Sequence, residues 1–168
     1  MLHAISAIGV EVLINGDSRQ AYARCALRLP DKCKVVAVAE PRPKTREQMV
    51  AAHNIAPEMA FNSFDEFKEA SKATIASSGK TLVDAVVVGV QDQMHISVVT
   101  ELAKHGYPML CEKPIATTPE ECIEMADAVK LSGKVFGVGH GKPISDLVVP
   151  GDVQHARQFC GTRRILWR

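Results

Sequence analysis

The chain has 168 residues, of which 46% are apolar and 23% are charged, and its formal net charge is +1. This length suits one domain, and the composition is that of an ordinary soluble globular protein rather than a disordered one. The near-zero charge gives no electrostatic basis for binding nucleic acid or a membrane surface, so we expect neither as a partner.

The sequence shows no recognisable targeting signal, and its cysteines are spaced as in proteins with reduced thiols, so we expect a cytoplasmic location. No apolar run approaches the ~20 residues that a membrane helix needs. The N-terminus lacks the basic segment and long apolar core of a secretory signal. The five cysteines are scattered and form no Cys-x-x-Cys pair. We therefore expect reduced thiols, with neither a disulfide framework nor a metal site.

Strands and helices alternate from the start of the chain. A β-rich segment at 10–15 ends at Gly16, and helical sequence follows over 19–29, where Pro30 stops it. The continuous apolar run at 34–39 is typical of a strand that is buried on both faces.

The middle of the chain continues this alternation. A helix is predicted over 44–54, a short strand over 59–61 and a further helix over 64–76. The segment 83–89 holds four valines in seven residues, a composition that favours a strand over a helix.

The last predicted elements have the clearest boundaries. A helix over 94–105 ends before a glycine, and a strand over 108–112 follows it. The sequence Thr118-Pro119-Glu120-Glu121 is a capping-box pattern that opens a helix reaching to about Ser132. Residues 135–139 form the sixth predicted strand.

This order of elements predicts the fold class. Alternating strands and helices indicate an α/β protein with a mostly parallel, six-stranded sheet covered on both faces. A doubly wound, Rossmann-like dinucleotide fold over residues 1–140 is the first candidate, and a flavodoxin-like sheet is the alternative. Residues 141–168 carry several glycines and prolines and no evident amphipathic helix, so we expect an irregular tail.

The segment from Gly16 to Ala21 lies where a phosphate-binding turn belongs, between the first strand and its helix. Glycine lets the backbone approach a pyrophosphate, and the helix N-terminus stabilises the negative charge. Ser18 replaces the second glycine of the usual Gly-x-Gly-x-x-Gly pattern, so a plain turn remains the alternative. Arg19 either assists a phosphate or is solvated.

Glu40 ends the second predicted strand, 24 residues after Gly16. An acid at this place can accept hydrogen bonds from ribose hydroxyls, which favours NAD. Arg42 could instead meet the 2′-phosphate of NADP, and an ordinary acid at a strand end is the structural alternative. The expected cofactor is therefore NAD or NADP, with NAD preferred.

Further polar residues follow the fourth and fifth strands, at the edge where open α/β sheets bind ligands. Gly89, Val90 and Gln91 end the fourth strand, and His95 begins the next helix as either a structural or a functional residue. The segment Glu112-Lys113-Pro114 follows the fifth strand. A lysine there can bind substrate or hold a hydroxyl proton during hydride transfer, whereas a surface lysine paired with Glu112 is the alternative.

Four segments in this order together resemble the Gfo/Idh/MocA family of oxidoreductases, which includes glucose–fructose oxidoreductase and inositol dehydrogenase. They are Ala37-Val38-Ala39-Glu40-Pro41, Val83-Asp84-Ala85-Val86-Val87-Val88, His95 and Cys111-Glu112-Lys113-Pro114-Ile115-Ala116. The resemblance covers roughly residues 8–140. It implies NAD(P)-dependent oxidation or reduction of CH–OH groups in sugars, cyclitols or related small molecules.

The resemblance also implies a role for each candidate residue. Lys113 is the expected catalytic lysine, with His95 as the second catalytic candidate. The expected cofactor contacts run along the chain from the phosphate turn to the lysine motif: Gly16, Ser18, Arg19, Glu40, Arg42, Gly89, Val90, Gln91, Glu112 and Pro114.

The family's second, α+β domain has no match in this sequence. That domain provides substrate contacts and much of the oligomer interface, so any oligomer of this chain would lack the usual interface. The tail at 141–168 resembles truncated or out-of-frame sequence, and we expect weak or no turnover by the chain alone. The alternative is a non-catalytic nucleotide-binding or partner-binding module derived from the family.

Overall fold

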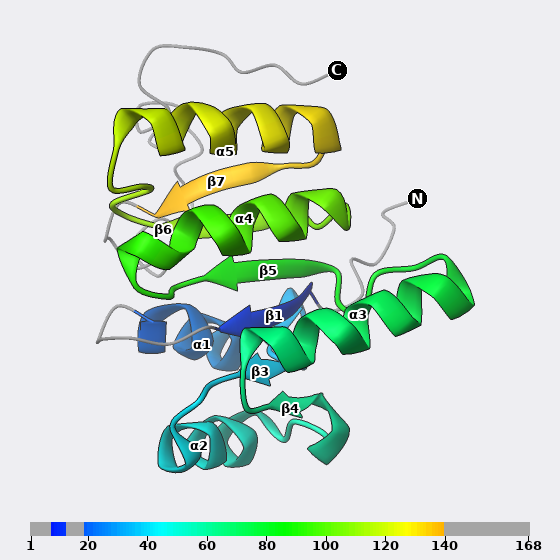
Figure 1. Ribbon diagram of the computed structural model, residues 1–168. Helices are drawn as coiled ribbons and strands as arrows, with labels where there is room; N and C mark the ends of the chain where they lie inside the picture. The colour runs from blue at the N-terminus through cyan, green and yellow to red at the C-terminus, as the bar shows by residue number, and fades with distance from the viewer. Residues whose placement is uncertain (1–7, 13–18, 140–168) are drawn as a thin grey trace.

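The computed structural model describes residues 8–12 and 19–139 of the chain (Figure 1). Every strand pairing in this part is parallel. The main sheet has five strands in the order β2 (Cys33–Lys34), β1 (Ile8–Val12), β5 (Ala85–Val88), β6 (Met109–Glu112) and β7 (Phe136–Gly139). A second ladder pairs β3 (Val38–Ala39) with β4 (Ala60–Phe61).

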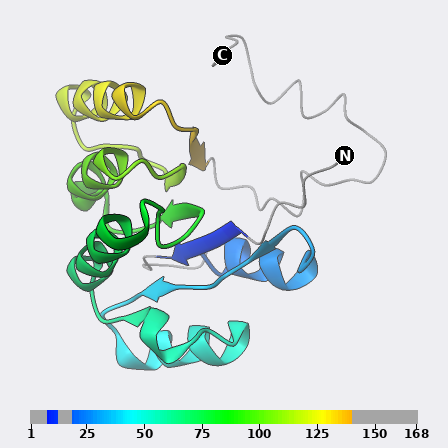
Figure 2. The same ribbon diagram turned by 90° about the vertical axis from the view of Figure 1, so that its right-hand side faces the viewer.

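Helices lie on both sides of these strands. Figure 2 shows α3, α4 and α5 on one side and α1 on the other. The helices are α1 (Arg19–Arg28), α2 (Pro43–His53), α3 (Phe64–Ser78), α4 (His95–Lys104) and α5 (Pro119–Ser132), with short 3-10 helices η1 (Pro57–Met59) and η2 (Asp92–Met94). The predicted alternation is thus confirmed, and an α/β Rossmann-like arrangement follows from it.

Local sequence signals account for the helix boundaries. The Thr118 side chain accepts a hydrogen bond from the Glu121 backbone N–H, and the Glu121 side chain accepts one from the Thr118 backbone N–H, so the predicted capping box is confirmed. Ser63 caps α3 by accepting from the Glu66 N–H. Gly133 ends α5 in the left-handed conformation that glycine adopts at little cost.

The prediction of one six-stranded sheet is wrong for the described residues. The segment expected to form one strand over 34–39 carries two short ones, because β2 pairs with β1 whereas β3 pairs with β4. An apolar run reports burial on both faces and contains no information about which backbone partner each residue finds. The run therefore predicts the burial correctly and the ladder incorrectly.

The core confirms that the segment at 34–39 is buried on two sides. Ala37 and Ala39 face the larger hydrophobic cluster, which includes residues of α3, α4, β5 and β6. Val38 faces a smaller cluster that includes Ala23 and Ala26 of α1. These three consecutive residues are fully buried, so their alternating side chains join the two cores.

Two further properties bear on the expectations from sequence. Among the described residues, no helix is both long enough and apolar enough to cross a membrane. The cysteines in the described part, Cys25, Cys33, Cys111 and Cys122, are free thiols. The tail at 141–168 and the remaining cysteine lie outside the described residues.

Candidate functional site

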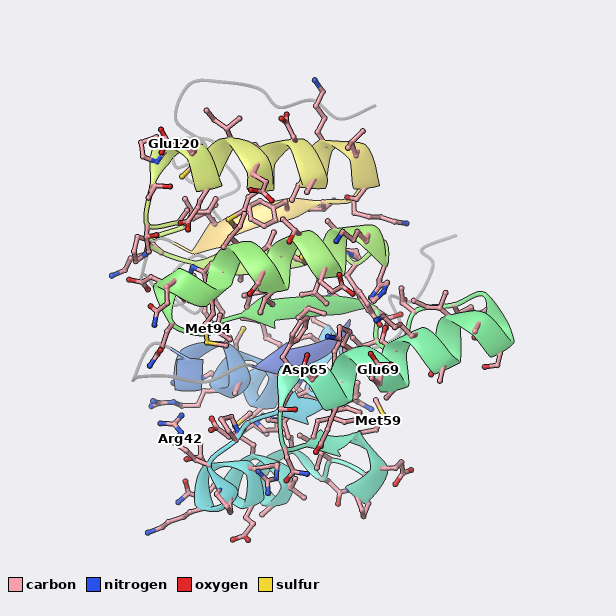
Figure 3. All side chains as sticks on the ribbon, viewed as in Figure 1. Arg42, Met59, Asp65, Glu69, Met94 and Glu120 are labelled. Carbon is pink, nitrogen blue, oxygen red and sulfur yellow. The ribbon has the colours of Figure 1, made fainter. Side chains whose placement is uncertain are left out.

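The parallel ladders bring the ends of several strands to one edge. Val88 of β5 pairs with Cys111 of β6, and Glu112 of β6 pairs with Gly139 of β7. The loops after β5 and β6 therefore leave the sheet side by side. Figure 3 shows Arg42, Met94 and Glu120, which follow β3, β5 and β6, on the side toward which the strand arrows of Figure 1 point. This carboxyl edge is where open α/β sheets bind ligands.

Glu40, which follows β3, is fully buried and held by Arg42. Its Oε1 accepts hydrogen bonds from the Arg42 backbone N–H and from Nε, each at 2.8 Å, and its Oε2 accepts one from Nη2 at 2.8 Å. The pairing raises the pKa of Arg42 above its usual value. The two residues expected to favour different cofactors thus form one two-pronged ion pair.

The Glu40 backbone is fixed as well. Its N–H donates to the Phe61 carbonyl at 3.1 Å, and its carbonyl accepts from Arg46 Nη1 at 2.6 Å. Arg46 lies on α2, so helix and strand end are joined at this point. Sequence reasoning did not single out Arg46, because a helical arginine six residues downstream looks like any solvated surface charge.

Glu112 ends β6 and is 7% exposed, yet it is only partly satisfied. Its Oε2 accepts a hydrogen bond from the Lys113 N–H at 3.3 Å, whereas Oε1 is buried and has no hydrogen-bond partner in the described structure. A buried carboxylate oxygen without a donor is costly, so this atom marks a place for a ligand group or water that donates a hydrogen bond.

His95 at the start of α4 is fully buried and supports the loop after β6. Its Nδ1 lies 2.9 Å from the Pro114 carbonyl oxygen and 3.2 Å from that of Ile115. Carbonyl oxygens only accept, so Nδ1 carries a proton and donates it. Nε2 is buried without a partner in the described structure. This arrangement suits a residue that positions the lysine loop.

Lys113 and Pro114 are exposed and joined by a cis peptide bond. The Lys113 ammonium has no ion-pair partner among the described residues, so the surface pair with Glu112 considered from the sequence is not observed. An unpaired cation beside a buried, half-satisfied carboxylate can bind a polar, hydroxyl-bearing ligand.

Cys111 immediately precedes Glu112, and its thiol is fully buried. This environment keeps the thiol protonated and therefore unreactive. Burial, the charge of Glu112 and the charge of Asp92 raise the pKa of Cys111 to about 12. Within the described ranges, no group of three His, Cys, Asp or Glu residues could hold a metal ion.

The structure describes fewer contacts for the remaining candidate residues. Gly89 is buried at the end of β5, Val90 is half-buried, and exposed Gln91 accepts a hydrogen bond from Gln93 Nε2 at 2.7 Å. Gly16 and Ser18 lie outside the described residues. Arg19 begins α1, but its side chain is not among those described.

Comparison with known proteins shows what this chain resembles. The model of the GFO_IDH_MocA family, described as an oxidoreductase family with an NAD-binding Rossmann fold, matches residues 10–140, well over half of the chain. An uncharacterized oxidoreductase of Streptococcus pneumoniae is 36% identical over 110 residues, which cover 56% of this chain and 29% of that protein. An inositol 2-dehydrogenase of Acidothermus cellulolyticus is 33% identical over 90 residues, which cover 52% and 26%.

Solved structures share the fold. The WlbA dehydrogenase from Bordetella pertussis, in complex with NADH and UDP-GlcNAcA, superposes with a TM-score of 0.64 at 20% identity, covering 81% of this chain and 36% of that one. An aldose-aldose oxidoreductase from Caulobacter crescentus gives a TM-score of 0.65 at 21% identity, covering 80% and 38%. This chain therefore spans between a quarter and two fifths of the length of these relatives.

Proposed function

This chain belongs to the Gfo/Idh/MocA oxidoreductase family, and from that premise we propose that it binds a nicotinamide dinucleotide, NAD in preference to NADP, along the carboxyl edge of its strands. The family match and the NADH bound to a structural neighbour support this assignment. The observation in this chain that carries it is the buried, unpartnered Oε1 of Glu112. A hydroxyl or amide of a bound dinucleotide would supply the missing donor.

The ion pair of Glu40 with Arg42 supports a preference for NAD. A carboxylate offers about four lone-pair positions, and the contacts from Arg42 occupy three of them, so one remains for a ribose hydroxyl. A 2′-phosphate would approach a buried negative charge while the cation that could neutralise it is already paired. We expect NADPH to bind more weakly than NADH for this reason.

Lys113 is proposed as the residue that binds the substrate hydroxyl and, in its neutral amine form, receives the hydroxyl proton, because its side chain is exposed and has no ion-pair partner in the described structure. A bound nicotinamide would supply the hydride acceptor. His95 then acts as a positioning residue for Lys113 through its hydrogen bond to Pro114. The substrate class proposed is a sugar, cyclitol or related polyol, by analogy with the inositol dehydrogenase relative.

Turnover by the 168-residue chain is expected to be weak or undetectable. Hydride transfer requires cofactor and substrate to be held in reactive geometry, and the chain spans 26% of the inositol dehydrogenase that it matches. Phosphate-turn residues Gly16, Ser18 and Arg19 are proposed to contact the pyrophosphate. A non-catalytic nucleotide-binding module is the remaining alternative.

Titration of the full chain with NADH and NADPH, followed by nucleotide fluorescence, tests the proposal. We expect saturable binding, tighter for NADH. An assay with inositol and a panel of sugars and polyols then separates an enzyme from a binding module, because turnover that Lys113→Met abolishes and Lys130→Met preserves requires the lysine chemistry. Absence of binding by either nucleotide would overturn the cofactor assignment.

A further inference from the structure

Tyr22 on α1 contacts the lysine loop through Glu112. The Tyr22 hydroxyl and the Glu112 carboxyl group both lie against Gly139, although Tyr22 and Glu112 are 90 positions apart in sequence. Tyr22 lies in the first half of α1, the helix that follows the predicted phosphate turn. This contact therefore joins the two ends of the proposed dinucleotide site.

Gly139 of β7 leaves the space that the pair occupies. A Cβ atom built at this position would overlap the Tyr22 hydroxyl and would lie 3.1 Å from Glu112 Oε1. Any other residue would therefore force the tyrosine or the carboxyl group to move. Gly139 pairs with Glu112 in the β6–β7 ladder, so the backbone register fixes this approach.

We propose that Tyr22 is a positioning residue, whose hydroxyl holds the Glu112 carboxylate so that its unpartnered Oε1 faces the dinucleotide. The inference rests on the proposed function, and it adds Tyr22 and Gly139 to the residues on which binding depends. Tyr22 acts through Glu112 and is not assigned a contact of its own with the ligand.

The titration of Tyr22 agrees with this contact. Burial, followed by the hydrogen bond to Glu112 and the charge of Glu112, raises the pKa of Tyr22 above its usual value. The chain has two tyrosines, and the other, Tyr107, is buried in the core against Ser71. A Tyr107→Phe background therefore leaves Tyr22 as the only source of a tyrosinate signal.

The first experiment measures the contact without any nucleotide. Tyrosinate absorbance is recorded against pH in Tyr107→Phe and in Tyr107→Phe/Glu112→Gln, over the range where circular dichroism shows both folded. We expect ionisation in the double variant at a pH lower by about one unit, the size of one charge-linked hydrogen bond. Coincident curves would overturn the inference, because Glu112 would then have no hold on Tyr22.

The second experiment measures NADH affinity in the full chain. Tyr22→Phe removes only the hydroxyl, and we expect about fivefold weaker binding, whereas Tyr107→Phe, a matched loss of a hydroxyl in the core, should change the affinity less than twofold. Equal affinity of Tyr22→Phe and the unaltered chain would overturn the positioning role. If the unaltered chain binds no NADH, the proposed function fails and the positioning role with it, even where the tyrosinate shift shows that the contact exists.

Gly139→Ala provides a second variant that does not alter the tyrosine. Its added methyl group should displace the Tyr22 hydroxyl and weaken NADH binding to a similar extent. In a Tyr22→Phe background the same change should have a smaller effect, because the hydroxyl that it displaces is already gone. Additive losses would show that Gly139 acts separately and would contradict the inference.

Discussion

The two buried acids at the carboxyl edge differ in how completely the protein satisfies them. Glu40 after β3 has both oxygens bound by Arg42 and its carbonyl bound by Arg46. Glu112 at the end of β6 is almost as buried, yet its Oε1 has no partner in the described structure. A satisfied acid fixes local structure, whereas a half-satisfied one leaves room for a ligand, so burial alone does not distinguish the two functions.

Removing His95, which contacts the loop after Glu112, should lower the free energy of unfolding most at neutral pH. His95→Ala removes a fully buried ring and its hydrogen bond to Pro114, so we expect the free energy of unfolding to fall by about 3 kcal/mol. Urea denaturation followed by circular dichroism measures this loss. His53→Ala, a half-buried histidine on α2, is the control and should cost less than about 1 kcal/mol. Equal losses in the two variants would mean that His95 does not support the loop.

Replacing Glu40 or Glu112 by the neutral glutamine should distinguish the roles of the two acids. Glu40→Gln releases Arg42 to meet a 2′-phosphate, so we expect the ratio of NADPH to NADH affinity to rise about tenfold, which corresponds to ~1.4 kcal/mol. Glu112→Gln should weaken the binding of both nucleotides alike, since Glu112 has no arginine partner among the described residues. Fluorescence titration of the two variants with both nucleotides gives the ratio. An unchanged ratio in Glu40→Gln would remove the reason for an NAD preference.

Removing the side-chain caps of α3 and α5 should change the free energy of unfolding by a smaller amount. Thr118→Ala breaks a reciprocal capping box at α5, and we expect a loss of about 1 kcal/mol in the free energy of unfolding. Ser63→Ala at α3 should lower the free energy of unfolding by less. The Glu66 side chain there accepts a hydrogen bond from the Asn62 backbone N–H, not from that of the capping residue Ser63. Chemical denaturation of both variants checks the order, and a larger loss for Ser63→Ala would reverse it.

Alkaline pH should reveal a difference that is absent near neutral pH, through Cys111. The pKa of the thiol is 9.0 in the unfolded chain, and burial raises it to about 12 in the folded one. The folded state therefore holds its proton longer, and this contribution to stability is complete below about pH 9 and is lost as the pH rises toward 12.

Stability measured across that range tests the effect. Cys111→Ala should flatten the alkaline fall of the unfolding free energy, and Glu112→Gln should flatten it in part, since the charge of Glu112 is one cause of the raised pKa. Cys122→Ala is the control. The same slope in the unaltered chain and in Cys111→Ala would contradict the assignment.

Local elements were predictable from the sequence to within a few residues. Residues Thr118 to Glu121 predicted a capping box, and the valines before Gly89 predicted a strand. Both signals depend only on neighbouring residues. The run at 34–39 was predicted as buried but not as two strands, since pairing depends on residues that are remote in sequence.

The candidate site was predictable as a set of positions rather than as a set of contacts. Glu40 and Arg42 were expected to act in opposition, and the structure pairs them. His95 was expected as a catalytic candidate, and its fully buried ring supports the lysine loop instead of facing solvent. Tyr22 on α1 belongs to no local motif, because its partner Glu112 lies on β6, 90 residues further along the chain.

The sequence by itself determined the α/β alternation, the helix boundaries and the placement of Lys113 after a buried strand. Each of these follows from interactions within a few residues, which a pattern of side chains records directly. Only the tertiary structure decided that Glu40 is satisfied and Glu112 is not. Glu40 takes its donors from Arg42, two residues along the chain, whereas Oε1 of Glu112 is enclosed by residues that are remote in sequence and supply no donor in the described structure.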